Sequence, residues 1–184
     1  MKKFLFFILF AGFFSSANAQ FGVRAGLNSS NFSDTNFNSK QGYHLGAYYR
    51  IQLGAMDIEP GLQYSKKGYE GNDNLSGDDI NERLNYIDIP VLVRFNLIET
   101  VNIFAGPQAS VLASRNYELG NITSTSTDVI RGYDIGAVFG VGVKLPLGLN
   151  LQASYDLGLT SLNYFDTDVK NRVFKVSLGI DLIK

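Results

Sequence analysis

Apolar and polar residues alternate one for one along most of the chain from Phe21 onward. Within 172–183, for instance, apolar residues occupy the even positions from 174 to 182, and polar or small residues occupy the odd positions from 175 to 181. This is the period of a β-strand whose two faces meet different surroundings. A slip of one residue would move charged side chains to the apolar face, so the register is strongly specified. The pattern therefore predicts an all-β fold.

Eight stretches show this alternation, and the connections between them are alternately short and long. The predicted strands are 21–28, 42–53, 55–66, 84–97, 101–114, 131–146, 149–160 and 172–183. The long connections are 29–41, 67–83, 115–130 and 161–171. Most of these strands reach the roughly 9–11 residues that a tilted strand needs to cross a bilayer. Because this rhythm is typical of bacterial outer-membrane proteins, we predict an eight-stranded antiparallel up-and-down transmembrane β-barrel.

Residues 1–19 have the organisation of a secretory signal peptide. A basic start at Lys2 and Lys3 is followed by an apolar core and by small residues that end in Ala-Asn-Ala. The apolar core is too short to span a bilayer as a helix. We therefore predict cleavage after Ala19, which leaves 20–184 as a single barrel domain in the outer membrane. Short turns of such barrels face the periplasm, so both termini are expected on that side.

The composition excludes several classes of protein. The chain has no cysteine, which rules out thiol catalysis, thiolate metal sites and disulfides. Its formal net charge is −1, so no basic surface for nucleic acid is indicated. After the signal peptide, no segment approaches the roughly 18 consecutive apolar residues of a transmembrane helix. The predicted barrel must therefore be stabilised by hydrogen bonds and packing alone.

The apolar face of the strands is predicted to point outward, into lipid. A soluble barrel such as a lipocalin would instead have that face inside. The interior of an eight-stranded barrel is only wide enough for side chains to fill, and so many large apolar residues would overfill it. Glycines on the polar face leave room inside for Tyr48 and Phe104. Since proline cannot donate a hydrogen bond to a sheet, we predict bulges at Pro60, Pro90 and Pro107.

Aromatic residues are predicted to gather near both ends of the strands. Tyr43, Tyr64 and Tyr133 lie near strand ends that meet long loops, and Phe21, Tyr49 and Phe95 lie near the opposite ends. Two girdles of aromatic rings at the membrane boundaries are typical of outer-membrane barrels. The alternative is that these are the ordinary aromatic residues of β-strands.

Charged residues of both signs fall on the inward face of the predicted strands. The basic ones are Arg24, Arg50, Lys67, Arg94, Lys144 and Lys175, and the acidic ones are Asp57, Glu59, Asp88, Asp134, Asp156 and Asp181. Buried charges must be paired, and equal numbers of each sign allow a self-neutralising interior. We therefore predict a plugged barrel without a constitutive aqueous pore. The alternative is that these residues bind a polar ligand or form a gated path.

The sequence indicates no catalytic or metal site. The sole histidine, His44, lies on the inward face without a nucleophile motif, so we predict a structural histidine bonded inside the barrel and no enzyme. An outer-membrane enzyme that uses His44 is a distant alternative. The acidic stretch 70–79 could hold a calcium ion, but its spacing fits no defined calcium loop. We therefore predict no cofactor.

Five motifs are spread over the chain after the signal peptide. They are FGVRAGLN at 21–28, EPGLQYSKKG at 59–68, LNYIDIP at 84–90, AGPQ at 105–108 and VFKVSLG at 173–179. These motifs resemble an outer-membrane β-barrel family that is widespread in Bacteroidetes and includes the PorT-like proteins. The resemblance implies a small barrel like OmpA or OmpX, without a general catalytic motif. The C-terminus departs from it, because such barrels commonly finish on an aromatic residue and this chain finishes Leu182-Ile183-Lys184.

The predicted function is that of a non-enzymatic outer-membrane barrel that serves envelope structure or surface interaction. It would be surrounded by outer-membrane lipid, and a protein partner would meet the long loops 29–41, 67–83, 115–130 and 161–171. We expect a monomer and no contact with nucleic acid. Because of the PorT-like resemblance, a component of a secretion or transport system is the alternative function.

Overall fold

The computed structural model describes residues 18–33, 38–72, 79–120, 122–127, 130–162 and 168–183, which form nine strands and a short 3-10 helix. The strands are β1 (Asn18–Phe32), β2 (Asn38–Leu53), β3 (Met56–Asn72), β4 (Asp79–Asn96), β5 (Val101–Leu119), β6 (Ile122–Ser124), β7 (Tyr133–Lys144), β8 (Leu149–Gly158) and β9 (Asn171–Ile183), and the helix η2 is Pro146–Gly148. None of the described residues belongs to a helix long and apolar enough to cross a membrane. The predicted signal peptide lies outside them except for Asn18 and Ala19, and its cleavage stays a prediction.

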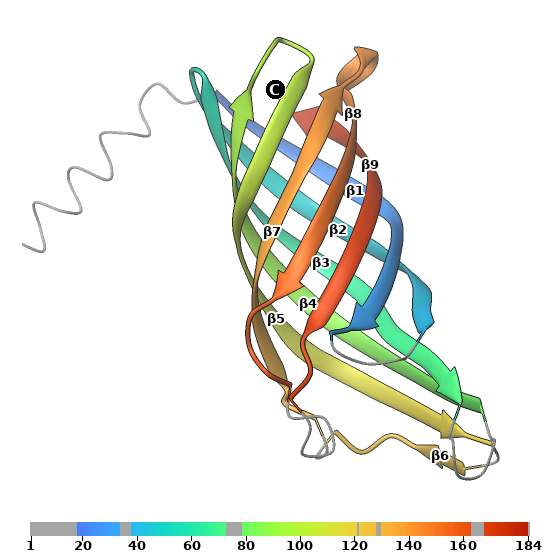
Figure 1. Cartoon of the computed structure of the whole chain (residues 1–184). Coiled ribbons are helices and arrows are strands. Elements are labelled where there is room, and N and C mark those ends of the chain that lie inside the picture. Colours follow the sequence, from blue (N-terminus) through green and yellow to red (C-terminus); the bar gives the residue numbers. More distant parts are fainter. Residues whose placement is uncertain are drawn as a thin grey trace, which may run out of the picture.

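Eight of the strands form a closed antiparallel ring. Neighbours along the chain pair with each other, and β1 pairs with β9 over nearly its whole length, which closes the barrel. β5 pairs directly with β7, while the short β6 pairs only with the last residues of β5, from Tyr117 to Leu119. Figure 1 shows the strands tilted about a common axis. The predicted eight-stranded up-and-down barrel is confirmed.

The two ends of the barrel differ in their connections (Figure 1). One end, which we call the turn end, has the short connections 54–55, 97–100 and 145–148, and Figure 1 marks the C-terminus at this end. The longer connections lie at the opposite end, which we call the loop end. The alternation of short and long connections in the sequence therefore corresponds to two different ends of the barrel.

The faces of the strands are arranged as predicted. Exposed and buried residues alternate without interruption along β9 from Asn171 to Ile180. Large apolar side chains lie on the outside of the ring, where Leu27 is 70% and Leu45 59% exposed. Charged side chains such as Arg24 lie inside and are almost fully buried. Such an apolar surface is suited to contact with lipid, whereas in water it would promote aggregation.

Two glycines make room for aromatic rings inside the narrow barrel. A Cβ atom at Gly22 would lie 2.4 Å from the Tyr48 ring, and one at Gly140 would lie 2.5 Å from the Phe104 ring. Real Cβ atoms do not tolerate such distances, so a side chain at either position would displace a ring. The predicted role of inward glycines is confirmed at these two positions.

Three of the predicted long loops are shorter than expected. The strands extend into these predicted loops: β2 begins at Asn38, β3 ends at Asn72, β4 begins at Asp79 and β5 ends at Leu119. The sequence-based boundaries were wrong because the outward apolar residues stop while backbone pairing continues. Inward residues in these extensions remain buried, as Tyr69 and Arg115 demonstrate. The barrel wall therefore continues past its apolar band at the loop end.

The bulges predicted at the three prolines are absent. The strands keep one register on both sides of Pro60, Pro90 and Pro107, with local gaps in pairing. A missing N–H group therefore interrupts the hydrogen bonding without shifting the strands. Register shifts occur elsewhere, including one between Asn85 and Tyr86 on β4. The proline prediction was wrong because a ladder tolerates a lost donor better than the inserted residue that a bulge requires.

An apolar cluster fills the barrel interior at the loop end. Its members, each at most 5% exposed, are Phe32, Tyr69, Leu84, Tyr86, Ile130, Leu162 and Val169. Backbone hydrogen bonds fasten the connecting segments to one another, from Arg131 N to Leu162 O at 2.8 Å and from Leu162 N to Val169 O at 2.9 Å. We call this cluster the loop cap. It places packed apolar side chains between the loop end and the polar interior.

Candidate functional site

Three arginines converge on one buried glutamate in the turn-end half of the interior. Glu59 on β3 accepts a hydrogen bond from Arg24 Nη1 at 3.0 Å and another from Arg50 Nε at 2.9 Å. Arg94 Nε and Nη2 donate to the two oxygens of the same carboxylate, each at 2.8 Å. Asp181 Oδ2 lies 3.3 Å from Arg50 Nη1 and is the second acid of the group. We call these five residues the arginine cluster.

Aromatic rings and an amide fix the guanidinium groups of the arginine cluster. The Tyr48 ring centre lies 4.2 Å from Arg24 Cζ, and the Phe104 ring centre lies 4.2 Å from Arg94 Cζ. Arg94 Nη2 also donates to Gln152 Oε1 at 2.7 Å. Cation–π contacts and charge-assisted hydrogen bonds hold a planar guanidinium in one orientation. The cluster is therefore a filled polar core in this half of the barrel.

A second group of paired charges lies nearer the loop end. Asp88 is fully buried, and its carboxylate lies 2.9 Å from Lys67 Nζ and 3.3 Å from Lys175 Nζ. Lys175 Nζ also lies 2.6 Å from Asp156 Oδ2. Ser110 Oγ donates a further hydrogen bond to Asp88 at 2.6 Å. We call Lys67, Asp88, Asp156 and Lys175 the lysine cluster, in which the two signs balance.

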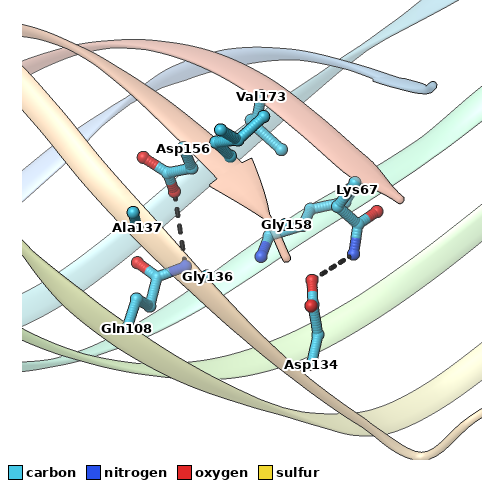
Figure 2. Close-up of a pocket in the computed structure, with 10 residues that line it drawn as sticks. Lys67, Gln108, Asp134, Gly136, Ala137, Asp156, Gly158 and Val173 are labelled. Carbon is cyan, nitrogen blue, oxygen red and sulfur yellow. Dashed lines mark hydrogen bonds between the residues drawn. The ribbon is translucent and has the colours of Figure 1, made fainter. Parts of the chain in front are cut away.

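A small cavity borders the lysine cluster (Figure 2). It has a volume of about 10 Å³ and is lined by polar groups that include Gln108, Asp134 and Asp156. Gln108 Nε2 donates to Asp156 Oδ2 at 3.4 Å across its wall, as Figure 2 shows. A cavity of this size holds about one water molecule. It leaves no space for an organic ligand.

The two clusters contain all the predicted interior charges except Asp57, Asp134 and Lys144. Asp57 accepts a hydrogen bond from Asn96 at 3.4 Å, and Asp134 accepts one from Asn171 at 2.9 Å. Lys144 is half-buried near the turn end. None of the three forms an ion pair with any residue in the described ranges. The structure therefore brings together most, but not all, of the predicted set.

Sequence reasoning missed a buried ion pair that lies outside the two clusters. Arg115 Nη2 donates to Glu82 Oε2 at 2.8 Å, and both side chains are at most 1% exposed. Both residues were assigned to long loops. The signal for Glu82 was present, because the alternation that places Asp88 inward continues through Tyr86 and Leu84 to Glu82. The bulge in this part of β5 hides the corresponding signal for Arg115.

His44 forms a buried pair with a serine inside the barrel. Its Nε2 lies 2.8 Å from Ser177 Oγ, and each residue is 2% exposed. Nucleophilic catalysis would also need a group that orients the histidine and access for the substrate. His44 Nδ1 has no hydrogen-bond partner among the described residues. His44 is therefore a buried side chain that is hydrogen-bonded to Ser177 inside the barrel.

The acidic stretch 70–79 falls largely outside the described residues, which omit 73–78. Within the described part, Glu70 Oε1 lies 2.8 Å from Lys40 Nζ, and Asp79 is the first residue of β4. In the described ranges there is no group of three or more histidine, cysteine, aspartate or glutamate side chains that could hold a metal ion. Calcium binding by this stretch stays a hypothesis from the sequence.

The closed ring, the apolar outer wall and the polar filled interior define a small β-barrel of the membrane-spanning class. The family model of the outer membrane protein beta-barrel domain matches residues 12–164. Because the match covers most of the chain, the protein belongs to the outer membrane protein beta-barrel domain family. Membership of this family supports the predicted location in an outer membrane.

Solved structures with the same fold include those of two bacterial proteins. Neisserial surface protein A (NspA) has a TM-score of 0.63 and 16% identity, with 90% of this chain and 99% of that chain covered. Ail, the attachment invasion locus protein of Yersinia pestis, has a TM-score of 0.56 and 14% identity, with 89% and 98% covered. At these identities the likeness extends to the fold alone. No curated protein matches the sequence.

Replacing Arg94 with alanine is expected to lower the free energy of unfolding by about 3 kcal/mol, because the change breaks a buried ion pair. Glu59 would keep Arg24 and Arg50 as partners, whereas Gln152 would lose its charged donor. Urea unfolding of the protein in lipid vesicles, followed by circular dichroism, measures the effect. An unchanged midpoint would show that Arg94 contributes nothing to the stability of the barrel.

Proposed function

We propose that this protein is a non-enzymatic, closed barrel of the outer membrane that serves envelope structure or surface interaction. The observation that supports this function best is the filling of the interior along its length. The arginine cluster occupies the turn-end half, the lysine cluster follows, and the loop cap covers the opening at the loop end. In a barrel built in this way, side chains occupy the space through which a solute would otherwise pass.

An enzymatic role using His44 is the less favoured function. Its partner Ser177 is buried inside the barrel, and both His44 and Ser177 are 2% exposed. Catalysis requires the reacting bond within hydrogen-bonding reach of the base. The distance between the histidine and the serine alone therefore does not favour catalysis.

We also propose that the turn end and both termini face the periplasm and that the loop end faces the exterior. Short periplasmic turns and longer external connections are the rule for barrels of this class. A protein partner would then meet the connections within 29–41, 67–83, 115–130 and 161–171, and the barrel would act as a monomer surrounded by lipid.

Cysteine labelling in intact cells tests this orientation, because the natural chain has no cysteine. Thr125→Cys introduces a thiol at an exposed position of the loop end, and Glu99→Cys introduces one at an exposed position of the turn end. A membrane-impermeant maleimide is expected to label Thr125→Cys in intact cells and Glu99→Cys only after the outer membrane is opened. The reverse pattern would contradict the proposed orientation, and protection of both thiols would contradict a surface role.

A second candidate function is a component of a secretion or transport system. What favours it is the resemblance of motifs such as 59–68 and 84–90 to those of PorT-like proteins. Deletion of the gene separates the two functions. Loss of secreted cargo without general leakage of the envelope would favour the secretion role, and unchanged export would favour the structural or surface role.

A further inference from the structure

The outer wall of the barrel has two basic residues, Lys66 and Arg172, on one side of its loop end. Lys66 on β3 follows Tyr64 by two positions toward the loop end, and Arg172 on β9 lies two positions beyond Phe174 in the same direction. The strand register turns both basic side chains outward. Neither forms an ion pair with a residue that the structure describes. Two available positive charges therefore border the apolar wall.

Uncharged polar groups occupy the wall between these cations. Ser29 on β1 pairs across the sheet with Gln41 on β2, and Gln41 Nε2 donates to Ser29 Oγ at 3.4 Å. Lys66 Nζ lies 6.0 Å from the centre of the Tyr43 ring on β2, and Arg172 lies on β9, which pairs with β1. The patch is thus continuous over four adjacent strands. We call Ser29, Gln41, Tyr43, Lys66 and Arg172 the belt patch.

The wall becomes apolar immediately toward the turn end. Leu27 pairs with Tyr43 on one side and with Val176 on the other, and Leu45 lies next along β2. Leu27 is 70% exposed, Leu45 59% and Val176 44%. In a bilayer such a surface contacts acyl chains. A ligand that spans both zones must therefore combine acyl chains with an anionic polar head.

Among the described residues of these four strands, no acid pairs with a cation of the belt patch. The exposed acid on these four strands, Glu70, lies 2.8 Å from Lys40 Nζ. On the neighbouring strand β4, by contrast, the outward Arg83 is already paired with Glu118 at 3.1 Å. At the loop end, the outward Arg83 therefore has an acidic partner, whereas Lys66 and Arg172 have none among the described residues.

We propose that the belt patch binds the phosphate-bearing headgroup of a lipid in the outer leaflet. Lys66 and Arg172 would contact phosphate oxygens, Gln41 and Ser29 would hydrogen-bond to the head, and the acyl chains would lie on Leu27. Basic groups near a membrane surface attract anionic headgroups by about 1 kcal/mol each. The choice of leaflet rests on the proposed orientation, whereas the binding itself does not.

Lipid binding is tested with the full mature chain folded in phosphatidylcholine nanodiscs that contain a fluorescent, phosphorylated lipid A. The double variant Lys66→Gln/Arg172→Gln is expected to bind this lipid roughly 30-fold more weakly, which is the loss of two such charge contacts. Arg83→Gln is the matched control and should change binding less than about twofold, because that cation already has a partner. Heat-modifiable migration on gels verifies that each variant is folded.

Three outcomes would overturn the lipid site. They are equal binding by the double variant, equal binding of dephosphorylated lipid A by the natural chain, and displacement of the lipid by millimolar inorganic phosphate, which would indicate a site for free anions. The cysteine labelling described above is independent of these results. Failure of the lipid site and failure of the proposed orientation are therefore distinguishable.

Discussion

Glu59→Gln is expected to lower the free energy of unfolding by about 5 kcal/mol, the largest effect of any single substitution in the interior. Glutamine keeps the size of the side chain but removes the negative charge that Arg24, Arg50 and Arg94 share. Asp181 would remain as the one acid of the arginine cluster, and of the three arginines it contacts only Arg50. Removal of one partner from a buried ion pair leaves an uncompensated charge, and here three charges lose the same partner.

Urea unfolding in lipid vesicles, followed by circular dichroism, measures this loss. Glu118→Gln is the matched control, because its partner Arg83 lies at 3.1 Å and both side chains are about one-third exposed. An exposed pair of this kind contributes only about 0–1 kcal/mol. Equal effects of Glu59→Gln and Glu118→Gln would contradict the role of Glu59 as the centre of a buried network.

Asp88→Asn is expected to have the next largest effect, a loss of about 4 kcal/mol in the free energy of unfolding. The fully buried carboxylate compensates both Lys67 and Lys175. Lys175 would keep Asp156 at 2.6 Å, whereas Lys67 would lose its acidic partner. The loss of unfolding free energy is therefore expected to arise mainly from the unpaired charge of Lys67.

A double-mutant cycle tests that assignment. Combining Asp88→Asn with Lys67→Met removes the stranded charge and is expected to restore part of the stability, since an apolar group replaces an unpaired cation. Glu70→Gln is the control, because Glu70 is 54% exposed and its loss should change stability little. Additive losses in the double variant would show that Asp88 and Lys67 do not depend on each other.

The strand number and the inward set of charges could be predicted because they follow from residue parity alone. Once 172–183 is recognised as a strand with an apolar outer face, Lys175 and Asp181 must point inward. The same reasoning places Glu59 and Asp88 inside. Parity also continues past the predicted strand ends, which is why Glu82 could have been found.

The partners of each charge could not be predicted, because they depend on the register between strands. Glu59 receives arginines from β1, β2 and β4, and only the stagger of the closed ring brings these three to one height. The loop cap depends in the same way on three separate segments, represented by Phe32, Ile130 and Leu162. These segments have no periodic pattern in common, so the sequence alone gave no sign that they would pack together.

The belt patch illustrates a further limit of sequence reasoning. Lys66 and Arg172 are more than one hundred positions apart in the chain, yet β2 and β1 alone lie between their strands. Their outward direction follows from parity, but their shared height at the loop end requires the register of the closed barrel. Neither residue stood out in the sequence, because Lys66 directly precedes the inward Lys67 and Arg172 stands between Asn171 and Val173 at the start of a strand.

Electrical recording across a planar bilayer tests most directly the central claim that the interior is filled. The purified natural chain, folded and inserted, is expected to give no stable open conductance, because the arginine cluster, the lysine cluster and the loop cap occupy the lumen in turn. Reproducible, long-lived conductance steps from folded natural protein would contradict the closed barrel.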